Sequence, residues 1–199
     1  MTRVWDMSLS LKLGLVYFAS EVLLTITRRS RSQTGTKQDK STLGMIWVVI
    51  ALSIAAGVFI SGSRTLRAGW IGLFDFPESD WIPVVAVALF ALGLAIRWWA
   101  IVILGRFFTV DVVIEKDHEL VERGPFRWVR HPSYTGVLLA FLGWSMTLWN
   151  WVAMAVVLVP ILVAFLRRMK VEEAALRGAL GDRYAEYMRR TKRLVPLVY

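Results

Sequence analysis

Two polar segments of this sequence carry the side chains best suited to chemistry, and each borders a long apolar run. The first is RWVRHPSYTG, which places two arginines, a histidine and a proline directly before an apolar stretch. The second contains Arg168 and Glu172, whose spacing of four residues puts them on one face of a helix. A guanidinium can grip a carboxylate through two hydrogen bonds, and a carboxylate can hold an ammonium group. Together these residue types could bind an anionic and a cationic group side by side.

Both segments also have a simpler interpretation. The charges of RWVRHPSYTG could anchor a membrane helix at the bilayer surface. Arg168 and Glu172 could form an exposed ion pair on a helix, worth about 0.2–0.5 kcal/mol. From spacing alone, the exposed ion pair is the favoured interpretation, so a binding site needs further support.

Several other kinds of site are excluded or unsupported. The chain has no cysteine, which excludes disulfides, thiolate metal sites and cysteine nucleophiles. Its two histidines, His118 and His131, are separated by a spacing that matches no compact metal-ligand motif, so we expect no metal. The sequence also lacks a GxGxxG fingerprint after a strand, a GxxxxGKS/T loop and a GxSxG elbow, so nucleotide-binding and hydrolase sites are unsupported.

The elements that must position these residues are membrane-spanning helices. Hydrophobic residues make up 56% of the 199 positions and cluster in long runs, and about 20 apolar residues span a bilayer as a helix. The formal net charge is +9, but the basic residues flank the apolar runs, as in membrane proteins. We therefore predict an all-α, polytopic integral-membrane protein with no nucleic-acid partner.

The apolar runs predict about five transmembrane helices. The first three are expected at residues 8–27, 43–62 and 81–104. Residues 134–166 form an apolar stretch interrupted only by Asn150, which is too long for a single span. Because asparagine favours turns, this stretch is predicted to be a C-terminal helical hairpin that turns around Asn150.

Two ionisable residues lie inside the predicted spans. Glu21 could be functional, or it could lie near an interface or pair with a neighbour. Arg97 could extend its guanidinium to the membrane surface or face a polar cavity. The sequence leaves both alternatives open.

Charge asymmetry predicts the orientation of the chain. Residues 28–40 and the tail from Arg167 onwards are strongly basic. Five crossings place both, together with residues 105–131, on one side of the membrane. Because positive charge favours the inside, we expect this side, and the polar site on it, to face the cytoplasm.

Residues 104–136, together with residues 167–196, resemble the isoprenylcysteine carboxyl methyltransferase family. The resemblance rests on RHPSYTG, then EE, GDRYAEY and RLVP, in this order. The family belongs with the phospholipid methyltransferases in a wider group of integral-membrane enzymes that use S-adenosyl-L-methionine. The apolar runs give N-terminal transmembrane helices in residues 1–104, and the resemblance implies a catalytic methyltransferase region in residues 105–199. We expect the two to form one integrated domain.

The resemblance also implies roles for individual residues. Arg168 would bind the methyl acceptor, and Glu172 would be the second catalytic position. Relatives commonly have tyrosine where this chain has Phe126, so a hydroxyl contact is absent there. The cofactor would be contacted by His118, Glu119, Leu120, Val121, Phe126, His131, Pro132, Ser133, Tyr134 and Glu172.

The implied reaction is methylation of the carboxylate of an isoprenylcysteine-like or other lipophilic acceptor. A carboxylate is already ionised near neutral pH and needs no general base. An amine acceptor would need one, and His131 and Glu172 are the candidates. Two alternatives remain: methylation of a phospholipid amine or small thiol on the same scaffold, and a non-enzymatic membrane transporter or assembly factor. The expected partners are the lipophilic acceptor and membrane lipids, and the sequence does not define an oligomeric state.

Overall fold

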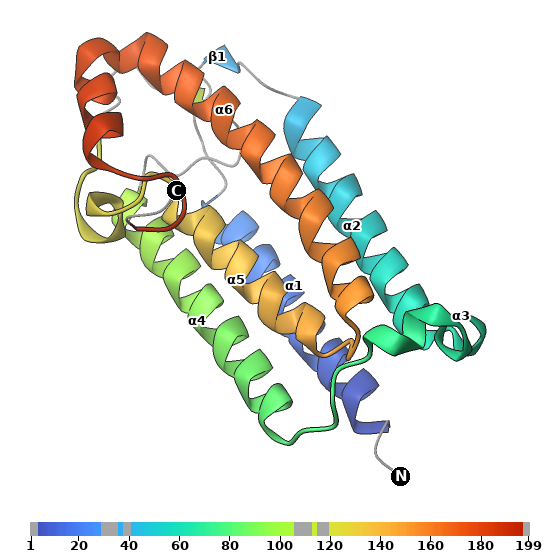
Figure 1. The fold of residues 1–199 in the computed structure, drawn as a ribbon. Helices are drawn as coiled ribbons and strands as arrows, with labels where there is room; N and C mark the ends of the chain where they lie inside the picture. Colours follow the sequence, from blue (N-terminus) through green and yellow to red (C-terminus); the bar gives the residue numbers. More distant parts are fainter. Residues whose placement is uncertain (1–3, 29–35, 38–40, 106–112, 115–119, 197–199) are drawn as a thin grey trace.

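The computed structural model describes residues 4–28, 36–37, 41–105, 113–114 and 120–196, and most of them are helical (Figure 1). A pair of two-residue antiparallel strands, β1 (Thr36–Lys37) and β2 (Val113–Ile114), is the only sheet within these ranges. The prediction of an all-α protein is confirmed. The long helices are α1 (Val4–Arg28), α2 (Ser41–Gly62), α4 (Trp81–Leu104), α5 (Pro132–Met146) and α6 (Trp151–Arg190), and the short ones are α3 (Arg64–Ala68), η1 (Trp70–Phe74) and η3 (Gly124–Arg127).

Four helices in the described part of the chain, α1, α2, α4 and α6, are long and apolar enough to cross a membrane. The fifth predicted helix, α5, has 15 residues and is therefore about 22 Å long, less than the roughly 30 Å of a hydrocarbon core. It packs between α4 and α6 (Figure 1). Because much of its surface contacts protein, α5 does not need the length of a helix that faces lipid.

The hairpin between α5 and α6 turns at Asn150, as predicted. The Asn150 Oδ1 accepts a hydrogen bond from the backbone N–H of Ala153 at 2.9 Å, so Asn150 is the N-cap of α6. Its Nδ2 donates to the backbone carbonyl of Ile71 at 3.0 Å and to Asp75 at 2.9 Å. The same buried side chain therefore starts α6 and attaches the hairpin to the connection between α2 and α4.

Glycines allow α4 and α5 to approach backbone to backbone. A Cβ atom at Gly93 would lie 2.4 Å from the backbone nitrogen of Ala140, and one at Gly136 would lie 2.6 Å from that of Arg97. A Cβ atom at Gly143 would lie 2.4 Å from a backbone oxygen of α4. Small residues of this kind mediate close helix packing in membranes. This contact fixes the start of α5 against α4.

Replacing Gly136 with alanine is expected to destabilise the protein by about 1–3 kcal/mol, because the added methyl group overlaps backbone atoms that cannot move aside cheaply. Gly44→Ala is the matched control, since nothing lies within 4 Å of the position that its Cβ would occupy. Thermal unfolding in detergent compares the two variants. Equal melting temperatures would show that the contact between α4 and α5 tolerates a side chain at Gly136.

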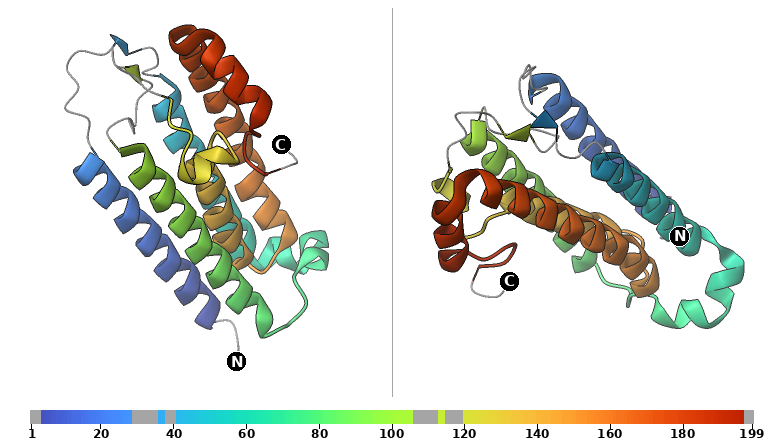
Figure 2. Two further views of the ribbon diagram at one scale, coloured as in Figure 1. Left: turned by 90° about the vertical axis from the view of Figure 1, so that its left-hand side faces the viewer. Right: turned by 90° about the horizontal axis from the view of Figure 1, so that it is seen from above.

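Beyond its apolar part, α6 continues as a polar helix and then changes direction. The backbone of Gly181 is non-helical, with φ 56° and ψ −132°, a left-handed region that glycine adopts without a steric penalty. After Gly181, residues 182–190, here called the second arm of α6, turn sharply from the first part of the helix (Figures 1 and 2). Residues 191–196, the return segment, then run back to the start of α5.

Candidate functional site

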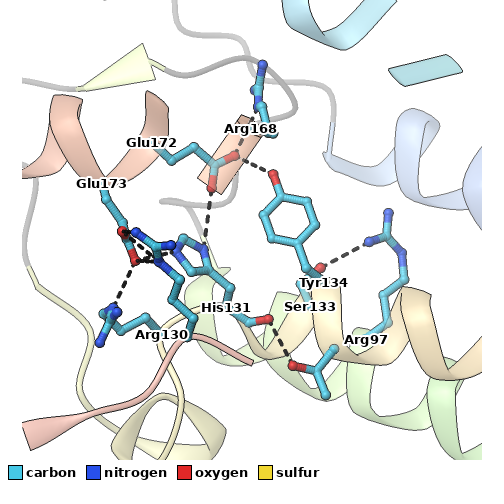
Figure 3. A network of polar contacts seen from close by, with 10 residues as sticks. Arg97, Arg130, His131, Ser133, Tyr134, Arg168, Glu172 and Glu173 are labelled. Carbon is cyan, nitrogen blue, oxygen red and sulfur yellow. Dashed lines mark hydrogen bonds and ion pairs between the residues drawn. The ribbon is translucent and has the colours of Figure 1, made fainter. Parts of the chain in front are cut away.

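The two polar segments singled out in the sequence meet in one network of polar contacts (Figure 3). Pro132 is in the first turn of α5, where its missing N–H costs no hydrogen bond. The return segment holds the residues before it: the backbone N–H of Arg130 donates to Lys192 at 2.8 Å, and that of His131 donates to Arg193 at 3.0 Å. The start of α5, the polar part of α6 and the return segment therefore build one site.

Glu173 lies at the centre of a buried ionic cluster. Its side chain is 5% exposed and accepts hydrogen bonds from Arg130 Nε at 2.9 Å and from Arg193 Nη2 at 2.6 Å. His131 Nε2 lies 3.2 Å from Glu173 Oε1. A buried carboxylate needs such compensation. Glu173 is saturated by these contacts and joins three separate segments of the chain.

Glu172 has a different environment. Its Oε1 accepts hydrogen bonds from the Tyr134 hydroxyl and from Arg168 Nε, the latter at 3.1 Å. Its Oε2 lies 3.6 Å from His131 Nδ1, which is too long for a normal hydrogen bond. The side chain is 22% exposed. One oxygen of Glu172 therefore keeps the capacity to accept hydrogen bonds from a ligand, and His131 lies between the two carboxylates.

Arg168 pairs with Glu172, but the pair is not an exposed one. The Arg168 side chain is only 2% exposed, so the sequence-based interpretation of a surface ion pair is wrong. This burial is a property of the packed molecule, which spacing along a helix cannot reveal. A buried guanidinium retains its charge and is stabilised by anions.

A second ionic cluster lies among the transmembrane helices and contacts the first turn of α5, where the site begins. Arg97 of α4 donates from Nε and Nη2 to the two carboxylate oxygens of Glu21 of α1, both at 2.8 Å. Its Nη1 donates to the Ser133 hydroxyl in the first turn of α5 at 3.0 Å. Of the alternatives left open by the sequence, pairing with a neighbour is correct for Glu21, and Arg97 is that neighbour.

The structure describes most of the remaining predicted residues. Leu120 and Val121 are partly buried and precede η3. Phe126 is buried in η3, and its carbonyl accepts a hydrogen bond from the Tyr187 hydroxyl at 2.6 Å. Tyr134 packs against Phe165 of α6, with the ring centroids 5.0 Å apart. The predicted positions His118 and Glu119 lie outside the described residues.

The prediction of site residues omitted Arg130, Glu173 and Arg193. All three lie within motifs that the sequence displays: Arg130 precedes the HP pair, Glu173 is the second residue of EE, and Arg193 begins RLVP. The adjacency of EE to a basic motif was a usable signal for a charge cluster. It did not reveal which of the two glutamates would be saturated by arginines.

Comparisons with known proteins agree on one family. The model of the isoprenylcysteine carboxyl methyltransferase (ICMT) family matches residues 86–178. Protein-S-isoprenylcysteine O-methyltransferase B of Arabidopsis thaliana is 33% identical over 120 residues, which cover 59% of this chain and 61% of that protein. The Schizosaccharomyces pombe protein-S-isoprenylcysteine O-methyltransferase is 35% identical over 115 residues, covering 57% and 49%. The probable enzyme of Oryza sativa subsp. indica is 30% identical over 128 residues, covering 62% and 67%.

The fold has a match among solved structures. The eukaryotic intramembrane Ras methyltransferase, an isoprenylcysteine carboxyl methyltransferase, superposes with a TM-score of 0.71 at 21% identity. The match covers 98% of this chain and 68% of that chain. At this identity the likeness concerns the fold alone. The regions aligned with the three relatives span between 49% and 67% of the relatives' own lengths.

Proposed function

Because the chain belongs to the isoprenylcysteine carboxyl methyltransferase family, we propose that it is an integral-membrane methyltransferase that uses S-adenosyl-L-methionine. The proposed acceptor is the carboxylate of an isoprenylcysteine-like or other lipophilic molecule. The observation that carries the proposal is the pair of opposite charges, Arg168 and Glu172, at the polar end of an apolar helix bundle.

The residues of the site fit the proposed cofactor. S-adenosyl-L-methionine has an ammonium group, a sulfonium and an adenine ring, and when bound it supplies an electrophilic methyl group. Glu172 suits the ammonium group because its Oε2 has no close hydrogen-bond donor within the site described above. Tyr134 and Phe126 provide aromatic surfaces of the kind that adenine and sulfonium groups favour.

Further cofactor contacts are proposed from the family resemblance. His131, Pro132 and Ser133 would form one wall, which the return segment and Arg97 hold in place. The other contacts would come from the chain that leads into η3: His118, Glu119, Leu120 and Val121.

Charge balance favours an anionic acceptor. Glu172 and Arg168 compensate each other in the structure. If Glu172 binds an ammonium group, Arg168 is left with less compensation for a buried positive charge, and an acceptor carboxylate restores it. The cofactor ammonium, Glu172, Arg168 and the acceptor carboxylate would then form a row of charges that alternate in sign. A carboxylate needs no general base, so the work of the protein is to position both molecules and to exclude water.

We propose that the site faces the cytoplasm. The second arm of α6 and the return segment lie at the same end of the bundle as the site and contain several basic residues. Basic segments at helix ends are favoured on the cytoplasmic side. The cofactor would reach the site from this side, and a lipophilic acceptor would reach it from the membrane.

Glu172→Gln is expected to weaken binding of S-adenosyl-L-methionine by roughly tenfold or more, because a hydrogen bond to a charged group contributes about 1.5–3 kcal/mol. Calorimetry with the purified protein measures this, with the demethylated cofactor as a second ligand. Glu186→Gln is the control, since its side chain is 61% exposed on the second arm of α6. Unchanged affinity in Glu172→Gln would contradict the assigned role.

Arg168→Gln should mainly impair use of the acceptor. A loss of cofactor affinity with normal use of the acceptor would reverse the two roles.

The chemistry of the product tests the function itself. Membranes that contain the protein would be incubated with cofactor labelled in its methyl group and separated into lipid, protein and small-molecule fractions. A carboxyl methyl ester releases labelled methanol in base, whereas a methylated amine or thiol does not. Base-stable label would support the alternatives, a phospholipid amine or a small thiol. Absence of transfer to any fraction would count against an enzyme.

A further inference from the structure

A basic cleft lies beside the site, between η3 and the second arm of α6. Its volume is about 540 Å³. The residues that line it form a charged rim and a partly polar floor. The rim consists of Glu122, Arg123, Arg127 and Arg190. The floor consists of the buried side chains of Tyr187 and Thr191.

The charge of the cleft favours an anion. Three arginines and one glutamate line the rim. Arg190 Nη2 donates to Glu122 Oε2 at 3.0 Å, but the Arg190 side chain is 57% exposed and that of Glu122 is 32% exposed. An exposed ion pair of this kind contributes only about 0–1 kcal/mol. It can therefore open for a ligand, and Arg123 and Arg127 are exposed on the same rim.

Two tryptophans beside the cleft indicate the level at which it lies relative to the membrane. The Arg127 guanidinium lies 5.5 Å from the ring centroid of Trp128, and Trp128 stacks edge to face with Trp99 at 6.3 Å. Trp99 lies five residues before the end of α4 at Leu104, which is about 7–8 Å along a helix axis. Both tryptophans are about half exposed. Half-exposed tryptophans near the end of a spanning helix sit at the level of the lipid headgroups.

The packing of η3 fixes the cleft at this level. Gly124 begins η3 with a φ of 60°, and a Cβ atom there would lie 3.0 Å from Ile103 Cγ1, in the last turn of α4. Because η3 rests on the end of a membrane-spanning helix, the guanidinium groups of the rim lie where phosphates of the adjacent leaflet are available.

We propose that this cleft binds the phosphate of an anionic phospholipid headgroup. The phosphate would lie between Arg127 of η3 and Arg190 of the second arm of α6, with charge-assisted hydrogen bonds to both. A membrane lipid is favoured over free phosphate because the cleft lies at headgroup depth, where anionic lipids are concentrated. The bound lipid joins the two segments that enclose the site from the polar side.

The test uses short-chain, soluble lipids and the full-length protein in non-ionic detergent. Dihexanoyl phosphatidylglycerol, dihexanoyl phosphatidylcholine and inorganic phosphate are titrated separately by calorimetry. The variant Arg127→Gln/Arg190→Gln removes two charges from the cleft. The control Arg177→Gln/Arg183→Gln removes two exposed charges of α6 that do not line it. Melting temperatures check that both variants fold.

We expect phosphatidylglycerol to bind the wild type and the control alike, and to bind the cleft variant about tenfold more weakly or worse, a change of at least about 1.4 kcal/mol. Equal weakening in both variants would show diffuse attraction and overturn the proposal. Equal affinity for phosphatidylcholine, or for inorganic phosphate, would also overturn it. None of these measurements depends on methyl transfer, so the proposal stands or falls separately from the proposed function.

Discussion

Glu173→Ala destabilises the protein by about 3–5 kcal/mol, the expected cost of breaking a buried ion pair from one side. The substitution leaves Arg130, Arg193 and His131 without their shared carboxylate, and Arg130 and His131 are almost fully buried. Arg193 belongs to the return segment, and its contact with Glu173 helps to hold that segment against the start of α5. Because the second arm of α6 leads directly into the return segment, it should also loosen. Reversible unfolding in mixed micelles measures the free energy of unfolding.

Glu172→Ala is the matched control for this prediction. It removes the same side chain from the neighbouring position, but Glu172 is 22% exposed and interacts with one arginine in place of two. We expect a smaller loss of stability and a larger loss of cofactor affinity than at position 173. If Glu173→Ala does not fold, Glu173→Gln keeps the volume and should still rank below Glu172→Gln in stability. Equal destabilisation at the two positions would contradict the division of roles between the two carboxylates.

The sequence was sufficient to locate the apolar spans and the turn of the hairpin, but not the polar continuation of α6 to Arg190. The third predicted span, residues 81–104, coincides with α4, because Asp80 and Gly105 bound an apolar run in which Arg97 is the single charged residue. The turn at Asn150 was also predictable, since an asparagine in an apolar stretch of that length has few other places to satisfy its amide. These features depend on local composition, which a single sequence displays directly.

Pairing between distant residues was not predictable. Glu21 and Arg97 were each recognised as unusual, but their contact depends on how α1 packs against α4. Likewise, the spacing of Arg168 and Glu172 predicted their contact but not the burial of Arg168, which depends on what packs against α6 at that point. Helical periodicity specifies a face of one helix and not the helix that covers it.

The two adjacent glutamates of the site show the same limit. Neighbouring residues on a helix project about 100° apart, so Glu172 and Glu173 were bound to have different surroundings. Which of them faces Arg193 is decided by the left-handed backbone of Gly181, which sends the return segment back to α5. That change of direction fixes the difference between a saturated carboxylate and one with an oxygen available to a ligand.

Arg97→Met should destabilise the protein by about 3–5 kcal/mol, because it leaves the Glu21 carboxylate unpaired among membrane-spanning helices. Glu21→Gln/Arg97→Met removes both charges and should recover much of this loss, since replacing a whole buried pair is often close to neutral. A double-mutant cycle on the free energy of unfolding should therefore yield a coupling at or above the upper end of the range of about 0.5–3 kcal/mol that residues in contact usually show. Additive effects of the single substitutions would contradict direct pairing.

The double variant also separates stability from positioning. It restores charge balance, but the Ser133 hydroxyl still lacks the hydrogen bond that Arg97 donates. If Arg97 positions the start of α5 through Ser133, the stable double variant should keep a reduced turnover with little change in the KM of the acceptor. Ser133→Ala should then reproduce that reduction with Arg97 and Glu21 intact. Full turnover in both variants would limit the role of this cluster to holding α1 against the bundle.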